Sequence, residues 1–77
     1  MDRSGDGSLD VQIGLRIKQL RQNNQLSEIQ VAARLGMPLA EYRSLEDGRT
    51  RANANTLLRL SVVLNTTVAN IYAGIIP

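Results

Sequence analysis

The segment QVAARLGMPLAEYRSLEDGRTR, residues 30–51, decides the fold because a glycine separates two short apolar repeats in it. Gly36 is the residue type that most easily takes the left-handed conformation that ends a helix. Pro38 follows, and its fixed φ and missing N–H suit the first turn of a helix but exclude the interior. A helix that begins near Pro38 and ends at Gly48 is therefore predicted, directly after a helix that ends at Gly36.

The helix before this turn begins at a capping sequence. Ser27 stands three residues before Gln30, and at this spacing each side chain can accept a hydrogen bond from the backbone N–H of the other residue. Ala32 is a small residue near the point where the two helices would cross. The pair therefore has the spacing of a helix-turn-helix.

Apolar spacing assigns the two sides of the second helix of this pair. Tyr42 and Leu45 are predicted to face inward, against Ile29, Val31 and Leu35 of the preceding helix. The opposite, outward side is predicted to carry Leu39, Ala40, Arg43 and Ser44.

Three more helices are predicted around the pair. Residues near 10–24 form an amphipathic helix with Ser8 or Asp10 as its cap, because Ile13, Ile17 and Leu20 recur at helical spacing. A fourth helix follows Asn53 or Asn55 as its cap and ends at Asn65 as a left-handed residue. Its inward residues are predicted to be Leu57, Leu60, Ser61 and Leu64. A short fifth helix is capped by Thr67 and carries Val68, Ile71 and Tyr72.

The expected organisation is one small all-α domain. The opening MDRSGDGS has no apolar repeat, so residues 1–8 are predicted to be a flexible leader and residues 9–77 the folded domain. A chain of 77 residues holds one domain at most. Five short helices with short links predict a compact bundle that depends on packing for its stability.

Composition argues against catalysis and against a membrane location. Cysteine and histidine are both missing from the sequence, which removes thiol nucleophiles, imidazole bases and the usual zinc ligands. We therefore expect no enzyme, no metal site and no cofactor. No apolar run approaches the roughly 18 residues needed to span a bilayer, and no signal peptide is recognisable, so we expect a cytoplasmic protein.

The charges favour an anionic partner. The formal net charge is +2, and residues 9–77 hold eight basic residues against five acidic ones. Eight of the nine basic residues of the whole chain are arginine, whose planar guanidinium makes bidentate contacts to phosphate or carboxylate. A solvated charged surface would look the same by charge alone.

Residues 13–72 as a whole resemble the Cro/CI (Xre-type) repressor helix-turn-helix domain. The resemblance covers about 60 of the 77 residues and rests on landmarks in register. These are IGLRIKQLR, the cap Ser27, Ala32, Gly36, LEDGR and TLLRLSVVLN. It implies a compact five-helix, lambda-repressor-like domain that is usually dimeric and binds double-stranded operator DNA.

The resemblance also implies roles for individual residues. A structural ion pair is expected between Arg21 and Glu46. Phosphate contacts are expected from Ser27, Arg49, Thr50 and Arg51. Base reading is expected from Leu39, Ala40, Arg43 and Ser44, with Arg43 as the best candidate for guanine. The alternatives for Arg43 are a phosphate contact and an ion pair with a neighbouring acid.

Some positions depart from this family. Relatives often carry glutamine, serine or threonine where this chain has Glu28, Pro38, Leu39 and Ala40, so amide readout of adenine is missing. The first interpretation is a transcriptional regulator, most simply a repressor that binds an inverted-repeat operator. The alternatives are an antitoxin-type regulator that depends on a protein partner, and a protein-interaction module that has kept the fold.

The apolar end of the sequence suggests a homodimer. A fifth helix exposing Ile71, Tyr72, Ile75 and Ile76 would form a two-fold contact that sets two reading helices about 34 Å apart, one DNA turn. The alternative is that these residues close the core of the monomer.

Overall fold

The computed structural model describes residues 5–73, with side chains from residue 9 onward, as five α-helices without a strand in this range. They are α1 (Gly5–Asn23), α2 (Glu28–Leu35), α3 (Leu39–Asp47), α4 (Ala54–Val63) and α5 (Val68–Ala73). The all-α prediction with five helices is confirmed. None of the described helices is both long enough and apolar enough to span a bilayer.

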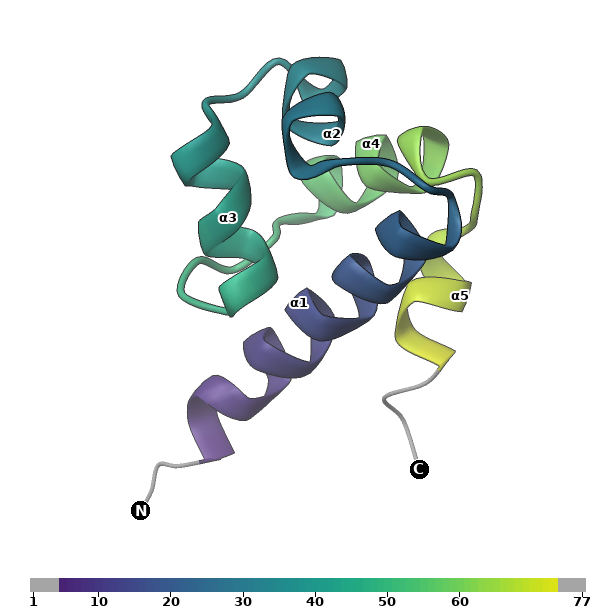
Figure 1. The fold of residues 1–77 in the computed structure, drawn as a ribbon. Helices are drawn as coiled ribbons and strands as arrows, with labels where there is room; N and C mark the ends of the chain where they lie inside the picture. Colours follow the sequence, from purple (N-terminus) through teal and green to yellow (C-terminus); the bar gives the residue numbers. More distant parts are fainter. Residues whose placement is uncertain (1–4, 74–77) are drawn as a thin grey trace.

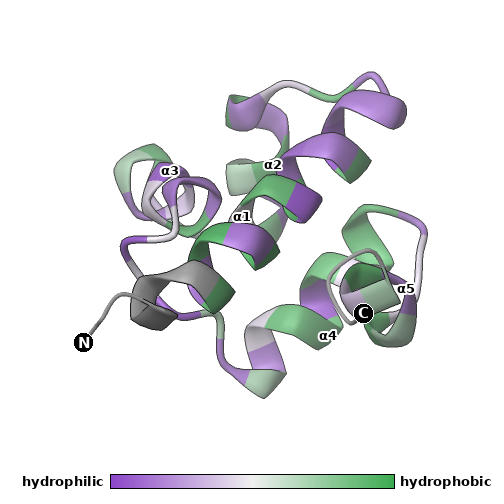
Figure 2. Cartoon of the chain, turned by 90° about the horizontal axis from the view of Figure 1, so that it is seen from below, coloured by the Kyte–Doolittle hydropathy of each residue, from purple (hydrophilic) through white to green (hydrophobic). Residues whose placement is uncertain are grey.

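The long helix α1 runs across the domain between α3 and α5 (Figure 1). It packs against α3 on one side and against α5 on the other, while α2 packs against α3 and α4, and α4 packs against α5. In Figure 2, apolar segments of α1, α4 and α5 are turned toward one another. Every helix contributes to the core of buried apolar residues: Ile13, Ile17, Leu20, Val31, Ala32, Leu35, Tyr42, Leu45, Leu57, Leu60, Leu64 and Ile71.

The first and last helices of the domain are also joined by a polar contact. The Nε and Nη2 atoms of Arg16 on α1 donate to the carbonyl oxygen of Asn70 on α5, at 3.3 and 3.2 Å. These residues are 54 positions apart in the sequence. The first and the last described helices therefore share one interface.

Helix α1 begins earlier than the sequence predicts. Residues 5–8 of the expected leader belong to α1, and residues 1–4 lie outside the described residues. The proposed caps Ser8 and Asp10 both fall after the start of the helix, so that part of the prediction is wrong. The additional turn contains two glycines, which have low helix propensity, and propensity alone therefore does not predict it.

The predicted helix ends are confirmed where a cap defines them. Ser27 and Gln30 form the complete capping box. The backbone nitrogen of Gln30 lies 3.1 Å from Ser27 Oγ, and that of Ser27 lies 2.8 Å from Gln30 Oε1. Gly36 and Gly48 have φ of 70° and 77°, in the left-handed region that glycine adopts without a steric penalty. The side chain of Asn53 caps α4 by accepting from the N–H of Thr56 at 2.8 Å.

Two predicted orientations are wrong. Ile29 is 65% exposed and does not pack against α3. On a helix it lies about 200° around the axis from Val31, so both side chains cannot face the core. Ile71 is fully buried, so it closes the monomer core and is not exposed for a dimer contact, whereas Tyr72 packs against the core and is half-buried. Ile75 and Ile76 lie outside the described residues.

Helices α1 and α3 approach each other closely at Gly14. A Cβ atom added to Gly14 would lie 2.5 Å from the carbonyl oxygen of Leu45 and would also overlap that of Glu46. Both neighbours are backbone atoms, which cannot rotate away as a side chain could. Glycine at this position therefore sets the distance between α1 and α3.

The loop between α1 and α2 holds one residue in a costly conformation, which leads to a stability prediction. Gln25 has φ of 59°, where a non-glycine residue pays about 1 kcal/mol or more. We expect Gln25→Gly to raise the free energy of unfolding by about 0.5–1 kcal/mol, after the greater freedom of glycine in the unfolded chain is deducted. Urea unfolding followed by circular dichroism measures the change.

Asn65 supplies the matched control, because it has a similar φ of 54° and asparagine tolerates this region better than glutamine. Asn65→Gly should therefore gain less than Gln25→Gly. An equal gain at both sites, or a loss at Gln25, would contradict the cost assigned to the loop.

Candidate functional site

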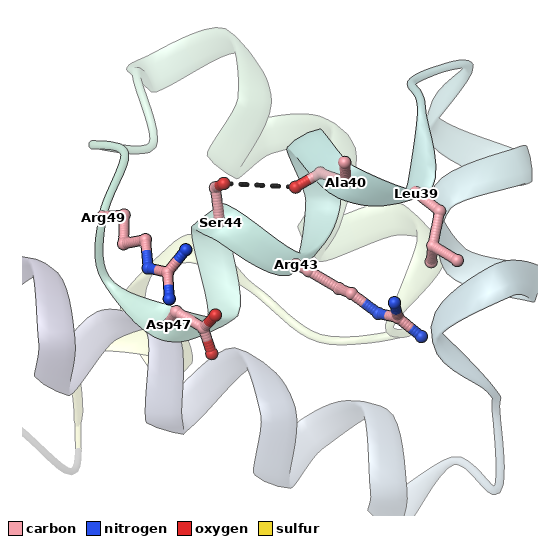
Figure 3. A pocket seen from close by; sticks show the side chains of 6 residues that line it. All are labelled: Leu39, Ala40, Arg43, Ser44, Asp47 and Arg49. Atoms are coloured by element: carbon pink, nitrogen blue, oxygen red, sulfur yellow. Dashed lines mark hydrogen bonds between the residues drawn. The ribbon is translucent and has the colours of Figure 1, made fainter.

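The outer side of α3 is the principal candidate surface. Ala40 and Arg43 are exposed there, while Leu39 and Ser44 are half-buried. The surface forms an open depression of about 510 Å³, shown in Figure 3. Its lining consists of Leu39, Ala40, Arg43, Ser44, Asp47 and Arg49. The structure thus brings together all four residues expected to read bases and one of those expected to bind phosphate.

The inner side of α3 is held by the core. Tyr42 is fully buried and Leu45 nearly so, as their spacing predicts. Leu39 also packs partly against the core, which limits how far its side chain reaches outward. Helix α3 is therefore fixed on one side and open to solvent on the other.

Arg21 and Glu46 meet as a buried bidentate pair between α1 and α3. Arg21 Nε lies 2.6 Å from Glu46 Oε2, and Arg21 Nη2 lies 3.2 Å from Glu46 Oε1. Arg21 Nη1 also donates to the carbonyl oxygen of Leu26 at 3.0 Å. One guanidinium therefore connects α1, the loop before α2 and the last turn of α3.

Tyr42 adds a second donor to this carboxylate. Its hydroxyl donates to Glu46 Oε2, one helical turn further along α3. Burial, followed by this hydrogen bond, raises the pKa of Tyr42 well above its usual value, so the hydroxyl keeps its proton. The hydrogen bond to Glu46 raises the pKa of Arg21 as well, although burial acts in the opposite direction. The four-residue spacing of Tyr42 and Glu46 was the available sequence signal for this contact.

An ion pair connects the helix-turn-helix pair on its outer side. Arg43 Nε on α3 donates to Glu28 Oε1 on α2 at 3.2 Å. Glu28 lies in the first turn of α2, where unpaired backbone N–H groups favour a negative side chain. An ion pair with a neighbouring acid was one alternative left open for Arg43 by the sequence, which did not identify Glu28 as the partner.

The residues expected to bind phosphate occupy two places. Ser27 precedes α2, where its Oγ accepts from Gln30 and keeps its own proton for a further acceptor. Arg49, Thr50 and Arg51 form the exposed loop after α3. The backbone N–H groups of Arg49 and Thr50 donate to the carbonyl oxygen of Ser44, so their side chains are what the loop offers to a ligand.

Two acidic residues near these positions were missed by the sequence reasoning. Asp47 lines the depression together with Arg49, and Figure 3 shows their side chains at the same end of α3. Asp10 Oδ1 lies 3.5 Å from Arg51 Nε, whose side chain is 81% exposed. An exposed pair of this kind contributes little to stability, so Arg51 can exchange Asp10 for another anion at small cost.

Arg59 of α4 was also missed, and it supports the turn between α2 and α3. Its Nη2 donates to the carbonyl oxygen of Leu35, one of the carbonyls at the end of α2 that have no partner within the helix. A basic side chain is favoured at the negative end of the helix dipole. Arg59 therefore stabilises the position from which α3 departs.

Comparison with known proteins identifies one family. A family model of the helix-turn-helix domain matches residues 12–71, from α1 to α5. No curated protein and no solved structure matched the sequence. The described part of the chain contains no group of three or more carboxylates that is placed to hold a metal ion.

Proposed function

The chain belongs to the helix-turn-helix domain family, and from this membership we propose that it is a sequence-specific DNA-binding transcriptional regulator, most simply a repressor. The observation that carries the proposal is the outer side of α3. Its exposed residues line one depression, while the buried Tyr42 and Leu45 hold the other side of the helix. A helix of this kind can enter the major groove without loss of its own packing.

Within the groove, the side chains of α3 offer different contacts. Arg43 donates to the O6 and N7 atoms of guanine. Leu39 and Ala40 contact thymine methyl groups. The Ser44 hydroxyl donates to the carbonyl oxygen of Ala40 at 3.1 Å, so its oxygen is the part that accepts from a base edge.

Phosphate contacts position α3 but do not specify the sequence. The amino terminus of α2 supplies Ser27 and the first-turn N–H groups. The loop after α3 supplies Arg49, Thr50 and Arg51. Because Glu28 lies in the same first turn as these N–H groups, the loop is the stronger of the two phosphate-binding regions.

The finer features of the proposal follow the Cro/CI (Xre-type) resemblance. We infer a homodimer that binds an inverted repeat, in which two copies of α3 occupy successive major grooves. The burial of Ile71 removes it from the expected dimer contact, and the half-buried Tyr72 is the remaining described residue of that contact. Ultracentrifugation with and without an inverted-repeat duplex tests this feature.

Salt titration tests the function itself. Duplex fragments from the source genome are first selected for binding, and the affinity of the best fragment is then measured at several salt concentrations. Each neutralised phosphate contributes about −0.9 to the slope of log K against log salt. Steep weakening with salt supports the proposal, and the absence of binding at low ionic strength would remove it.

Paired arginine variants separate phosphate contacts from base reading. Arg49→Ala with Arg51→Ala should weaken binding to all duplexes alike and reduce the magnitude of the salt slope by about 0.9 for each phosphate that is no longer neutralised. Arg43→Ala should instead change the preference among duplexes. Titration of a preferred and a scrambled duplex measures both effects.

The matched control removes two exposed positive charges from outside α3 and its loop, through Lys18→Ala with Arg34→Ala. We expect a smaller loss of affinity than for the loop pair. An unchanged sequence preference in Arg43→Ala would contradict the role assigned to α3.

A second candidate function is a protein-interaction module, including an antitoxin-type regulator that acts with a protein partner. The acidic residues near the reading surface favour it, because Glu28 pairs with Arg43 and Asp47 lines the depression. A module of this kind would bind DNA weakly and with little dependence on salt.

A further inference from the structure

We propose that Glu28 is a positioning residue that directs Arg43 toward a guanine, an inference that rests on the proposed DNA-binding function. It assigns to the first turn of α2 a role in sequence discrimination, in addition to any phosphate contact made there. The contact that carries it is the ion pair between Glu28 Oε1 and Arg43 Nε, at 3.2 Å.

The carboxylate of Glu28 is the better fixed of the two partners. Its side chain is 32% exposed, against 57% for Arg43. The backbone of Glu28 lies within the capping box formed by Ser27 and Gln30, which fixes the first turn of α2. The positive end of the helix dipole also favours a negative charge at this place. Glu28 therefore acts as a stationary acceptor, and the longer side chain of Arg43 is held against it.

The contact uses one edge of the guanidinium and leaves its far end for another ligand. Nε donates to Glu28, whereas Nη1 and Nη2 donate to no residue in the described part of the chain. These two nitrogens form a planar fork that matches the O6 and N7 acceptors of guanine. In Figure 3, Arg43 points away from Arg49 and Asp47, toward the opposite end of the depression.

The charge of Glu28 also has different effects on the two DNA groups that Arg43 could contact, a phosphate and a guanine. A phosphate that approaches Arg43 carries a full negative charge, and a carboxylate paired with the same guanidinium repels it. The O6 and N7 atoms of guanine belong to a neutral base and meet much weaker repulsion. Glu28 therefore lowers the overall affinity for DNA and raises the preference for guanine over other bases.

Glu28→Gln and Glu28→Asp test the inference by separating charge from position. The wild-type protein is first used to select its preferred site from randomised duplexes. Affinities for this site and for a scrambled duplex are then measured for each variant at two salt concentrations, after urea unfolding has shown that the variants are folded. Glu28→Gln should strengthen binding to the scrambled duplex and reduce the ratio of the two affinities about tenfold, within the range that one bidentate base contact supplies.

Glu28→Asp keeps the charge but is one methylene too short to hold the same contact. We expect it to reduce the ratio while leaving affinity for the scrambled duplex near that of the wild type. In an Arg43→Ala background, Glu28→Gln should not change the ratio any further, because the residue that it positions is gone.

Glu41→Gln is the matched control, since Glu41 is an exposed acid on α3 and makes no ion pair with another described residue. It should raise both affinities together and leave the ratio unchanged. If the wild type selects a site but both Glu28 variants keep the affinity ratio of the wild type, the positioning role is overturned while DNA binding stands. If the wild type binds no duplex at low salt, the proposed function fails, and the inference that rests on it fails as well.

Discussion

Glu46→Ala is expected to lower the free energy of unfolding by about 3–5 kcal/mol, the range typical of breaking a buried ion pair by removal of one partner. The variant would leave the Arg21 guanidinium buried without its carboxylate, and the Tyr42 hydroxyl would lose its acceptor at the same time. A chain of 77 residues has a total stability of about 4–12 kcal/mol. The variant should therefore lose a large share of its stability, which urea unfolding or thermal melting will measure.

Two further variants show whether the charge or the packing is responsible. Glu46→Gln keeps an acceptor for Arg21 and Tyr42 while it removes the charge, so we expect an intermediate loss. Arg21→Met combined with Glu46→Leu replaces both charges by apolar groups of similar volume and should recover much of the stability. A double variant as unstable as Glu46→Ala would show that the charged pair is needed for more than mutual compensation.

Gly14→Ala is expected to lower the free energy of unfolding by about 1–3 kcal/mol, the usual cost of overpacking. By helix propensity alone, the same change in the interior of α1 would stabilise the protein by about 1 kcal/mol. The added methyl group overlaps the carbonyl oxygens of Leu45 and Glu46, so α1 and α3 have to move apart. Because α3 is the proposed reading helix, its preference among duplexes should weaken as well.

Gln12→Ala is the control for the stability loss expected of Gly14→Ala, because Gln12 is exposed on the same helix. Its unfolding free energy should change by only a few tenths of a kcal/mol. A gain in stability for Gly14→Ala would show that propensity outweighs the close approach of the helices, contrary to the packing described above.

Local chemistry explains which parts of the fold could be predicted. The capping box at Ser27, the glycine ends at Gly36 and Gly48, and the Asn53 cap each depend on residues within one turn of the chain. All the residues that form such a signal are neighbours in the sequence, so the signal can be recognised without the structure. The outward side of α3 was predictable for the same reason, because Tyr42 and Leu45 define the opposite, buried side by their spacing.

The remaining contacts depend on which helix ends meet in space, and spacing along the chain does not report this. Arg43 reaches Glu28 across 15 positions, and Arg59 reaches the carbonyl of Leu35 across 24. The exposure of Ile29 shows a related limit, because an eight-residue helix has too few turns for apolar composition alone to define its buried side. The burial of Ile71 followed from the packing of α5 against α1 and α4.

The interface between α1 and α5 has a consequence for biosynthesis. Ile17, near the middle of α1, and Ile71 of α5 are fully buried in the same core, and Arg16 reaches Asn70 across 54 positions. While the ribosome still holds the segment that becomes α5, the emerging polypeptide exposes the apolar side of α1. Because helices this short are marginal alone, the native state of this domain can form only after the α5 segment has left the exit tunnel.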